Sequence, residues 1–288
     1  MKNDSMIEMH NLNFSYTNKP FVKNINFTVT KGEIFGFLGP SGAGKSTLQK
    51  ILTGLLPTYT GSASVMGVDC RHHNSSFYER IGVDFEFPCV YEKLTARENL
   101  SYFSSLYDGN KRDIDELLRD VGLEGHADKR VSDFSKGMKS RLGFIRALVH
   151  DPDVLFLDEP TSGLDPNNSR IMKDLILKER DNGKTIIITT HNMDDATELC
   201  DRVAFIVNGE MKALDTPHSL IMAHGASKIK YTFTDPDGKE LERVSALSEI
   251  SEDKTFIQKI SSNSLTSVHS SEPTLSDIFM EITGYELC

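Results

Sequence analysis

The segment EIFGFLGPSGAGKST, residues 33–47, decides the fold of this 288-residue chain. Its apolar run IFGFL is typical of a strand that is buried on both faces of a parallel sheet. The loop after it fits the pattern G-x-x-x-x-G-K-[ST], with Gly39, Gly44, Lys45 and Ser46 at the fixed positions. The sequence LQKILTGLLP then has helical spacing, so the loop stands between a strand and a helix, as this motif requires. We therefore predict a phosphate-binding loop and a nucleotide ligand.

The chemistry of such a loop rests on its glycines and on the helix that it opens. Glycines let backbone amides turn toward a phosphate, and the N-terminus of the helix favours an anion. We expect Lys45 to reach the β- and γ-phosphates and the Ser46 hydroxyl to ligate Mg²⁺. The residues expected to hold the phosphates are Gly39, Pro40, Ser41, Gly42, Ala43, Gly44, Lys45, Ser46 and Thr47.

Two further strand-like segments end in polar side chains. DVLFLDEP, residues 153–160, carries Asp158 and Glu159 directly after four apolar residues, and KTIIITTH ends in His191. Asp158 is placed to hold the metal or its water shell beside the phosphate loop. Glu159 is placed to act as the general base on a water, and His191 to donate to the γ-phosphate or to that water.

Strands and helices alternate along much of the chain, which predicts an α/β fold with a parallel sheet covered by helices. Residues 87–150 have helical spacing and interrupt this alternation. From about residue 226 the chain is richer in serine, and EPTLSDIFMEITG near the end predicts a capped helix with Thr274 and Asp277 in a capping box. We expect a nucleotide-binding core over 1–86 and 151–215, a helical subdomain over 87–150, and a small α+β C-terminal region over 216–288.

Composition excludes several classes of protein. Hydrophobic residues make up 38% and charged residues 26%, as in a globular protein. The apolar runs are strand-sized and fall short of the roughly 20 residues that span a bilayer, and no apolar signal region opens the chain, so we expect it in the cytoplasm. The net charge of −10 argues against nucleic acid as a partner, which requires a basic face. The four cysteines have no zinc spacing.

Together these segments resemble the ATP-binding cassette (ABC) ATPases over roughly residues 5–215. FSKGM, residues 134–138, is similar to the signature of that family, and SGLD, residues 162–165, to its D-loop. Tyr16 stands where family members place an aromatic ring that stacks on adenine. The resemblance implies a P-loop NTPase core of the RecA-like type, an N-terminal antiparallel β subdomain, and hydrolysis of ATP with Mg²⁺.

The resemblance also implies that one chain is half of an enzyme. In the family two cassettes face head to tail and enclose two ATP molecules. Ser135 and Gly137 would then contact the γ-phosphate held by the other cassette, and Asp165 would communicate between the two sites. We expect a second cassette as partner, in a homodimer or a heterodimer.

The chain departs from the family pattern in two places. Lys136 and Met138 stand where the signature has a glycine and a glutamine, and Glu86 stands at the Q-loop glutamine. A carboxylate at position 86 can still ligate Mg²⁺, but it adds negative charge near the γ-phosphate. Hydrolysis could persist, slow down, or require a more conventional cassette as partner. Because Lys45 and Glu159 are present, we expect activity, with Glu86 among the catalytic residues and with Ser46, Glu86 and Asp158 as metal ligands.

Transport is the function we expect. The segment FPCVYEKLTARENL, residues 87–100, has apolar side chains suited to a membrane-embedded permease, although locally Phe87, Val90, Tyr91 and Leu94 could equally pack the helical subdomain. A P-loop kinase or GTPase would leave FSKGM, SGLD and His191 unexplained. The alternative is a non-transport ABC ATPase with soluble partners, whose usual second cassette, coiled coils or zinc modules are not evident.

The C-terminal region indicates the direction of transport. Residues 216–288 resemble the tails of ATP-binding subunits of bacterial drug, antibiotic and polysaccharide exporters. We therefore expect an ABC-2-type exporter subunit, bound peripherally to the inner face of the cell membrane through its permease. The permease would select the substrate. The tail could make a regulatory contact or stabilise the dimer.

Overall fold

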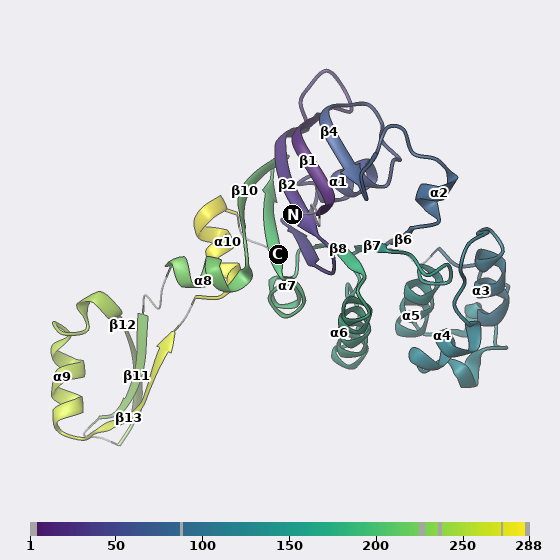
Figure 1. The fold of residues 1–288 in the computed structure, drawn as a ribbon. Coiled ribbons are helices and arrows are strands. Elements are labelled where there is room, and N and C mark those ends of the chain that lie inside the picture. Colours follow the sequence, from purple (N-terminus) through teal and green to yellow (C-terminus); the bar gives the residue numbers. More distant parts are fainter. Residues whose placement is uncertain (1–4, 87–88, 225–227, 236–237, 272, 286–288) are drawn as a thin grey trace. The chain divides into compact units, whose positions relative to one another are not determined.

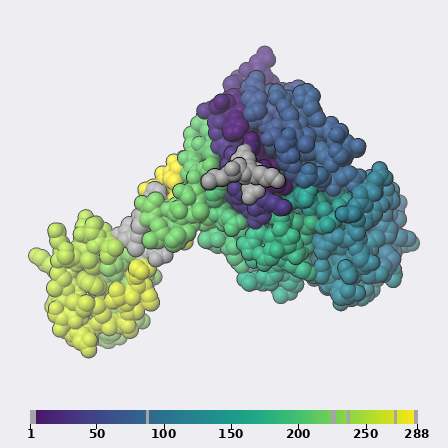
Figure 2. All heavy atoms as spheres, viewed as in Figure 1, coloured from purple at the N-terminus to yellow at the C-terminus, as the bar shows by residue number. Residues whose placement is uncertain are grey.

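The computed structural model describes residues 5–285 except 87–88, 225–227, 236–237 and 272. The chain forms two compact units, one extending to Leu214 and one beginning at Asp215. Figure 2 gives the second unit the green-to-yellow end of its colour scale. In the described part of the chain, no helix has both the length and the apolar character needed to cross a membrane.

The first unit begins with an antiparallel sheet of four strands. Its order is β2-β1-β4-β5, and its strands are β1 (Ser5–Phe14), β2 (Val22–Thr30), β4 (Tyr59–Val65) and β5 (Val68–Asp69). From Ile25 to Thr30 buried and exposed residues alternate, so one face of β2 is in the core and the other faces solvent.

The second sheet has six strands in the order β10-β9-β3-β8-β7-β6. The strands are β3 (Ile34–Leu38), β6 (Ile81–Asp84), β7 (Val154–Asp158), β8 (Thr185–Thr190), β9 (Arg202–Val207) and β10 (Glu210–Asp215). The pairs from β9 to β6 are all parallel. Leu38 is in register with Thr190, and Asp158 with Thr189, so the ends of β3, β7 and β8 meet at one edge of the sheet.

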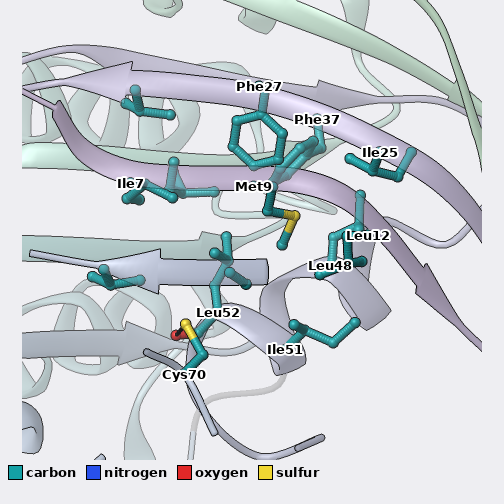
Figure 3. Packing of buried hydrophobic residues seen from close by; sticks show 14 of the residues in the cluster. Ile7, Met9, Leu12, Ile25, Phe27, Phe37, Leu48, Ile51, Leu52 and Cys70 are labelled. Atoms are coloured by element: carbon teal, nitrogen blue, oxygen red, sulfur yellow. Dashed lines mark hydrogen bonds between the residues drawn. The ribbon is translucent and has the colours of Figure 1, made fainter. Parts of the chain in front are cut away.

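Helix α1 (Lys45–Leu52) packs against residues of both sheets. Its apolar residues Leu48, Ile51 and Leu52 are buried in one cluster with residues of both sheets, among them Met9 and Phe37 (Figure 3). Truncating such a buried leucine to alanine typically costs about 2–5 kcal/mol. This packing fixes the start of α1, and with it the loop between β3 and α1.

The remaining helices of the first unit fall into two groups. Helix α2 (Ser75–Tyr78) contacts β6, α7 (Met193–Leu199) contacts β3, and α6 (Pro166–Asp181) packs against α7. Helices α3 (Ala96–Ser104), α4 (Ile114–Asp120) and α5 (Lys136–Arg146) lie between β6 and β7 in sequence and pack against one another (Figure 1). Short 3₁₀ turns at Glu124–His126 and Val131–Asp133 link α4 to α5.

The second unit contains an antiparallel sheet with the order β12-β11-β13. Its elements are α8 (Pro217–His224), β11 (Lys228–Thr234), β12 (Glu240–Ala246), a 3₁₀ turn (Leu247–Glu249), α9 (Lys254–Ser261), β13 (Leu265–Ser271) and α10 (Leu275–Thr283). Tyr231 and Phe233 are buried, and the Phe256 ring of α9 lies 5.1 Å from that of Tyr231. The predicted capping box of Thr274 and Asp277 at the start of α10 is confirmed. The predicted α/β fold is also confirmed: a parallel sheet, an antiparallel β subdomain, inserted helices and a small α+β extension.

Candidate functional site

The loop between β3 and α1 has a backbone that only glycine tolerates at several points. Gly42 and Gly44 have φ angles of 78° and 113°, in the left-handed region that side chains disfavour. A β-carbon on Gly39 would lie 2.0 Å from the carbonyl oxygen of Ile206 in β9. The glycines predicted from the motif are therefore required by the shape of the loop.

Lys45 lies across this loop. Its Nζ donates hydrogen bonds to the carbonyl oxygens of Gly39, at 2.6 Å, and Pro40, at 3.2 Å. Burial lowers the pKa of Lys45, while the carboxylates of Glu159, Asp158 and, less strongly, Glu86 oppose that shift. The structure thus holds a buried lysine next to three carboxylates at the mouth of the loop.

A pocket of about 200 Å³ opens above the loop. Its lining residues are Phe21, Ser41, Gly42, Ala43, Gly44, Lys45, Ser46, Thr47, Glu86, Asp158, Glu159 and His191. The structure thus brings most of the predicted site residues together, while Gly39 and Pro40 bind Lys45. The pocket is open to solvent on one side, so a ligand held here by its phosphates could extend beyond it.

Asp158 is positioned by hydroxyl groups from two elements. Thr189 of β8 donates to Oδ1, and the Ser46 Oγ lies 3.5 Å from Oδ2. Hydroxyl and carboxylate oxygens are the ligands that Mg²⁺ accepts. Among the described residues no three His, Cys, Asp or Glu side chains form a metal-binding group. The Ser46 hydroxyl and the Asp158 carboxylate nevertheless fit Mg²⁺, because this ion is usually bound by one or two carboxylates together with substrate phosphates.

Glu159 is held by Thr190, the last residue of the neighbouring strand β8, and by His191, which follows it. The Thr190 hydroxyl donates to Oε2 over 3.1 Å, and His191 Nδ1 lies 2.9 Å from Oε1. Because a carboxylate only accepts, His191 carries its hydrogen on Nδ1 in this contact and Nε2 is left for another group. Glu159 itself has a φ of 50°, which costs about 1–2 kcal/mol in a residue with a side chain. Strained backbone of this kind is concentrated at functional sites.

The sequence reasoning missed three residues of this site. Thr189 and Thr190 hold the two carboxylates, and a signal for them existed, because both end the segment TIIITTH directly before His191. Phe21 lines the pocket, and no motif identifies it. The Phe21 ring lies 5.4 Å from that of Tyr16.

Tyr16 borders the pocket rather than lining it. Its hydroxyl is 3.0 Å from Thr47 Oγ1, and its side chain is 56% exposed. The ring also meets Phe14 edge to face at 4.7 Å. An aromatic face thus remains open beside the phosphate loop.

Ser135, Gly137 and Asp165 form a second group, which within the described residues is separate from the pocket. Ser135 caps α5 by accepting a hydrogen bond from the backbone N–H of Met138 over 3.3 Å. A β-carbon on buried Gly137 would fall 2.5 Å from the Asn168 side chain, and Asn168 donates to Asp165, the cap of α6. The signature segment and the SGLD segment therefore meet on one surface.

Three comparisons with known proteins agree with this geometry. The sequence model of the family described as ABC transporter matches residues 22–162. The fluoroquinolones export ATP-binding protein of Mycobacterium tuberculosis is 46% identical over 285 residues, which cover 98% of this chain and 94% of that protein. The Nod factor export ATP-binding protein I of Rhizobium meliloti is 36% identical over 301 residues, with 98% and 89% covered.

A solved structure shares both the fold and part of the sequence. It is an ATP-binding cassette in a dimeric post-hydrolysis state, bound to ADP and Pi. Its TM-score is 0.65 at 25% identity, with 73% of this chain and 98% of that one covered. The chain belongs to the ATP-binding proteins of the ABC transporter family.

Proposed function

We propose that this chain is the ATP-hydrolysing subunit of an exporter and that it works as a pair of cassettes below a membrane permease. The observation that carries the proposal is the pocket in which Lys45, Asp158, Glu159 and His191 meet beside the phosphate loop. The 46% identity to an export ATP-binding protein over nearly the whole chain supports the choice of exporter.

In the proposed reaction each residue of the pocket has a separate role. The loop amides and Lys45 would bind the phosphates. Ser46, Asp158 and Glu86 would hold Mg²⁺, whose charge would offset that of the phosphate oxygens. Glu159 takes a proton from the attacking water, since Thr190 and His191 orient its carboxylate. With both ring nitrogens protonated, His191 would donate from Nε2 to the γ-phosphate while its Nδ1–H stays on Glu159. Tyr16 offers its exposed ring to adenine.

The second cassette completes each site. Ser135 and Gly137 do not line the pocket of their own chain: Ser135 is exposed, and Gly137 is packed against Asn168. Placed against the γ-phosphate of the opposite cassette, the start of α5 would supply backbone N–H groups and a favourable helix dipole. Asp165, joined to Gly137 through Asn168, would link the two sites.

An apolar groove is the proposed contact with the permease. It is lined by Leu55, Tyr78, Ile81, Val83, Phe85, Phe103 and Tyr107, with Thr53, Arg146 and Ala147. Leu55 is 55% exposed, and apolar surface of this kind marks interaction sites. Of the segment predicted to dock, Tyr91 is 49% exposed yet also packs on Tyr102 and Phe103, while Phe87 lies outside the described residues. Docking here would hold the chain at the inner face of the membrane.

Affinity purification of the tagged chain from its native membranes in mild detergent tests this proposal. We expect a multispanning protein in stoichiometric amount, whose identity narrows the substrate among drugs and other amphiphiles. Leu55→Glu should lose that protein, whereas Ile260→Glu, which changes an equally exposed residue of α9, should keep it. Recovery of soluble partners alone, such as ribosomal or DNA-repair proteins, would overturn transport and leave the ATPase assignment in place.

A further inference from the structure

The phosphate pocket has more negative than positive side chains. Glu86, Asp158 and Glu159 line it together with one lysine, Lys45. Asp158 and Glu159 accept hydrogen bonds from threonine hydroxyls, but Glu86 is exposed and makes no hydrogen bond or ion pair with any residue that the structure describes. A triphosphate adds several negative charges, so the pocket of one chain is short of cations even with Mg²⁺ bound.

Lys136 is an exposed cation on the surface where the signature and SGLD segments meet. It is the first residue of α5 and, within the described chain, forms neither a hydrogen bond nor an ion pair. Its Nζ lies over Gly163, because a β-carbon on Gly163 would fall 2.0 Å from that nitrogen. No acidic residue stands in the first turn of α5, and a lysine there opposes the helix dipole. Its charge therefore does not stabilise the helix.

These two unpaired charges lie on the two surfaces that the proposed dimer brings together. We propose that Lys136 of one cassette supplies the cation that the opposite pocket lacks. It pairs there with one carboxylate oxygen of Glu86 beside the terminal phosphate, and the other oxygen of Glu86 remains for Mg²⁺. This inference rests on the proposed composite site. It accounts for Glu86 and Lys136 together, since a carboxylate replaces a neutral amide on one side and a lysine replaces glycine on the other; it does not explain Met138.

The expected size of the effect follows from exposure and symmetry. An exposed ion pair changes an equilibrium by a factor of about 2 to 5. A two-fold symmetric dimer contains the pair twice, so losing Lys136 should weaken ATP-dependent dimerisation by about tenfold at low salt. The difference should shrink in 0.5 M salt, where the screening length falls to roughly 4 Å.

The test measures the dimer dissociation constant by sedimentation velocity. The full chain carries Glu159→Gln to prevent hydrolysis and is saturated with ATP and Mg²⁺. Lys136→Met, Glu86→Gln and the double variant are compared, since methionine keeps the helix propensity of lysine. Lys111→Met removes an equal charge from an exposed position in the loop before α4 and serves as the control.

We expect Lys136→Met to weaken the dimer about tenfold and Lys111→Met to change it less than twofold. In the Glu86→Gln background the effect of Lys136→Met should fall below about threefold, because the charge it offsets is gone. Equal effects of Lys136→Met in both backgrounds, or an effect no larger than that of the control, would overturn the ion pair while leaving the composite site intact. A parent protein that stays monomeric in ATP would overturn the composite site and the ion pair with it.

Discussion

Replacing Thr190 with valine should slow ATP hydrolysis without weakening the binding of ATP. The Thr190 hydroxyl donates to Glu159 Oε2 over 3.1 Å, and its side chain is only 2% exposed. Valine has nearly the same shape, so the strand should keep its packing. Glu159 would lose one of the two hydrogen bonds that position its carboxylate, and the carboxylate would rotate more freely about the remaining hydrogen bond from His191.

The magnitude follows from the charge of the acceptor. A hydrogen bond to a charged group contributes about 1.5–3 kcal/mol. If the whole free energy of that hydrogen bond stabilises the transition state in which Glu159 takes the proton, its loss should lower kcat by about 10- to 100-fold, since 1.36 kcal/mol corresponds to a factor of ten. KM should stay within about twofold, because Thr190 does not line the pocket in which the phosphates would bind.

A control in the same strand separates this effect from stability. Thr185→Val is also a buried substitution in β8, and like Thr190→Val it removes a hydroxyl that accepts from a backbone N–H. The affected amides are those of Gly32 and Asn192, each 3.0 Å from its hydroxyl. Steady-state ATPase kinetics and urea unfolding of both variants provide the comparison. If Thr190→Val kept kcat within twofold of wild type, or lost no more than Thr185→Val, the orienting role of Thr190 would be wrong.

Three further predictions concern single carboxylates. Glu86→Gln should change the ATPase rate less than tenfold, because Asp158 remains for the metal; a larger increase in steady-state rate would contradict retained activity. Burial raises the pKa of Asp84 to about 7, so the stability that this residue contributes should fall as pH rises from about 4 to 7. The free energy of unfolding of Asp84→Asn should therefore rise by at least about 1 kcal/mol relative to wild type over that window. A difference in urea unfolding that does not depend on pH would refute this. Hydrogen bonds from Ser245 and Tyr231 help lower the pKa of Asp253 to about 2, so its stabilisation is present above about pH 4 and lost as pH falls through 2. Asp253→Asn should cost about 1 kcal/mol at pH 7, seen as faster hydrogen exchange in β11, and unchanged exchange there would argue against it.

Local signals made much of the fold predictable from the sequence. The phosphate loop was identified because its glycines, lysine and serine stand at fixed spacing between a buried strand and a helix. The end of β7 was identified because four apolar residues run directly into Asp158 and Glu159. The cap of α10 was identified because Thr274 and Asp277 are three residues apart, and the structure shows both of their hydrogen bonds. In each case the residues that interact are close in sequence.

Features that depend on distant partners were missed. Strand β6 (Ile81–Asp84) has only four residues, one of them a glycine, and it forms because it pairs with β7 about seventy residues later. Thr190 directly precedes His191 in the sequence, but its contact with Glu159 becomes visible only once β8 pairs with β7. Gly137 is buried against Asn168 of the following helix, a contact that no spacing in the sequence reveals. These features are set by contacts between residues that are distant in sequence, and the periodicity of the sequence does not predict such contacts.

The molar mass of Glu159→Gln in saturating ATP and Mg²⁺, measured by light scattering, tests the central claim most directly. Two cassettes that enclose ATP should give twice the 32.2 kDa of one chain, and adding Ser135→Arg should return the mass to that of one chain. A single-chain mass for Glu159→Gln in ATP, or a dimer that Ser135→Arg leaves unchanged, would contradict a site built from the phosphate loop of one cassette and the signature of the other.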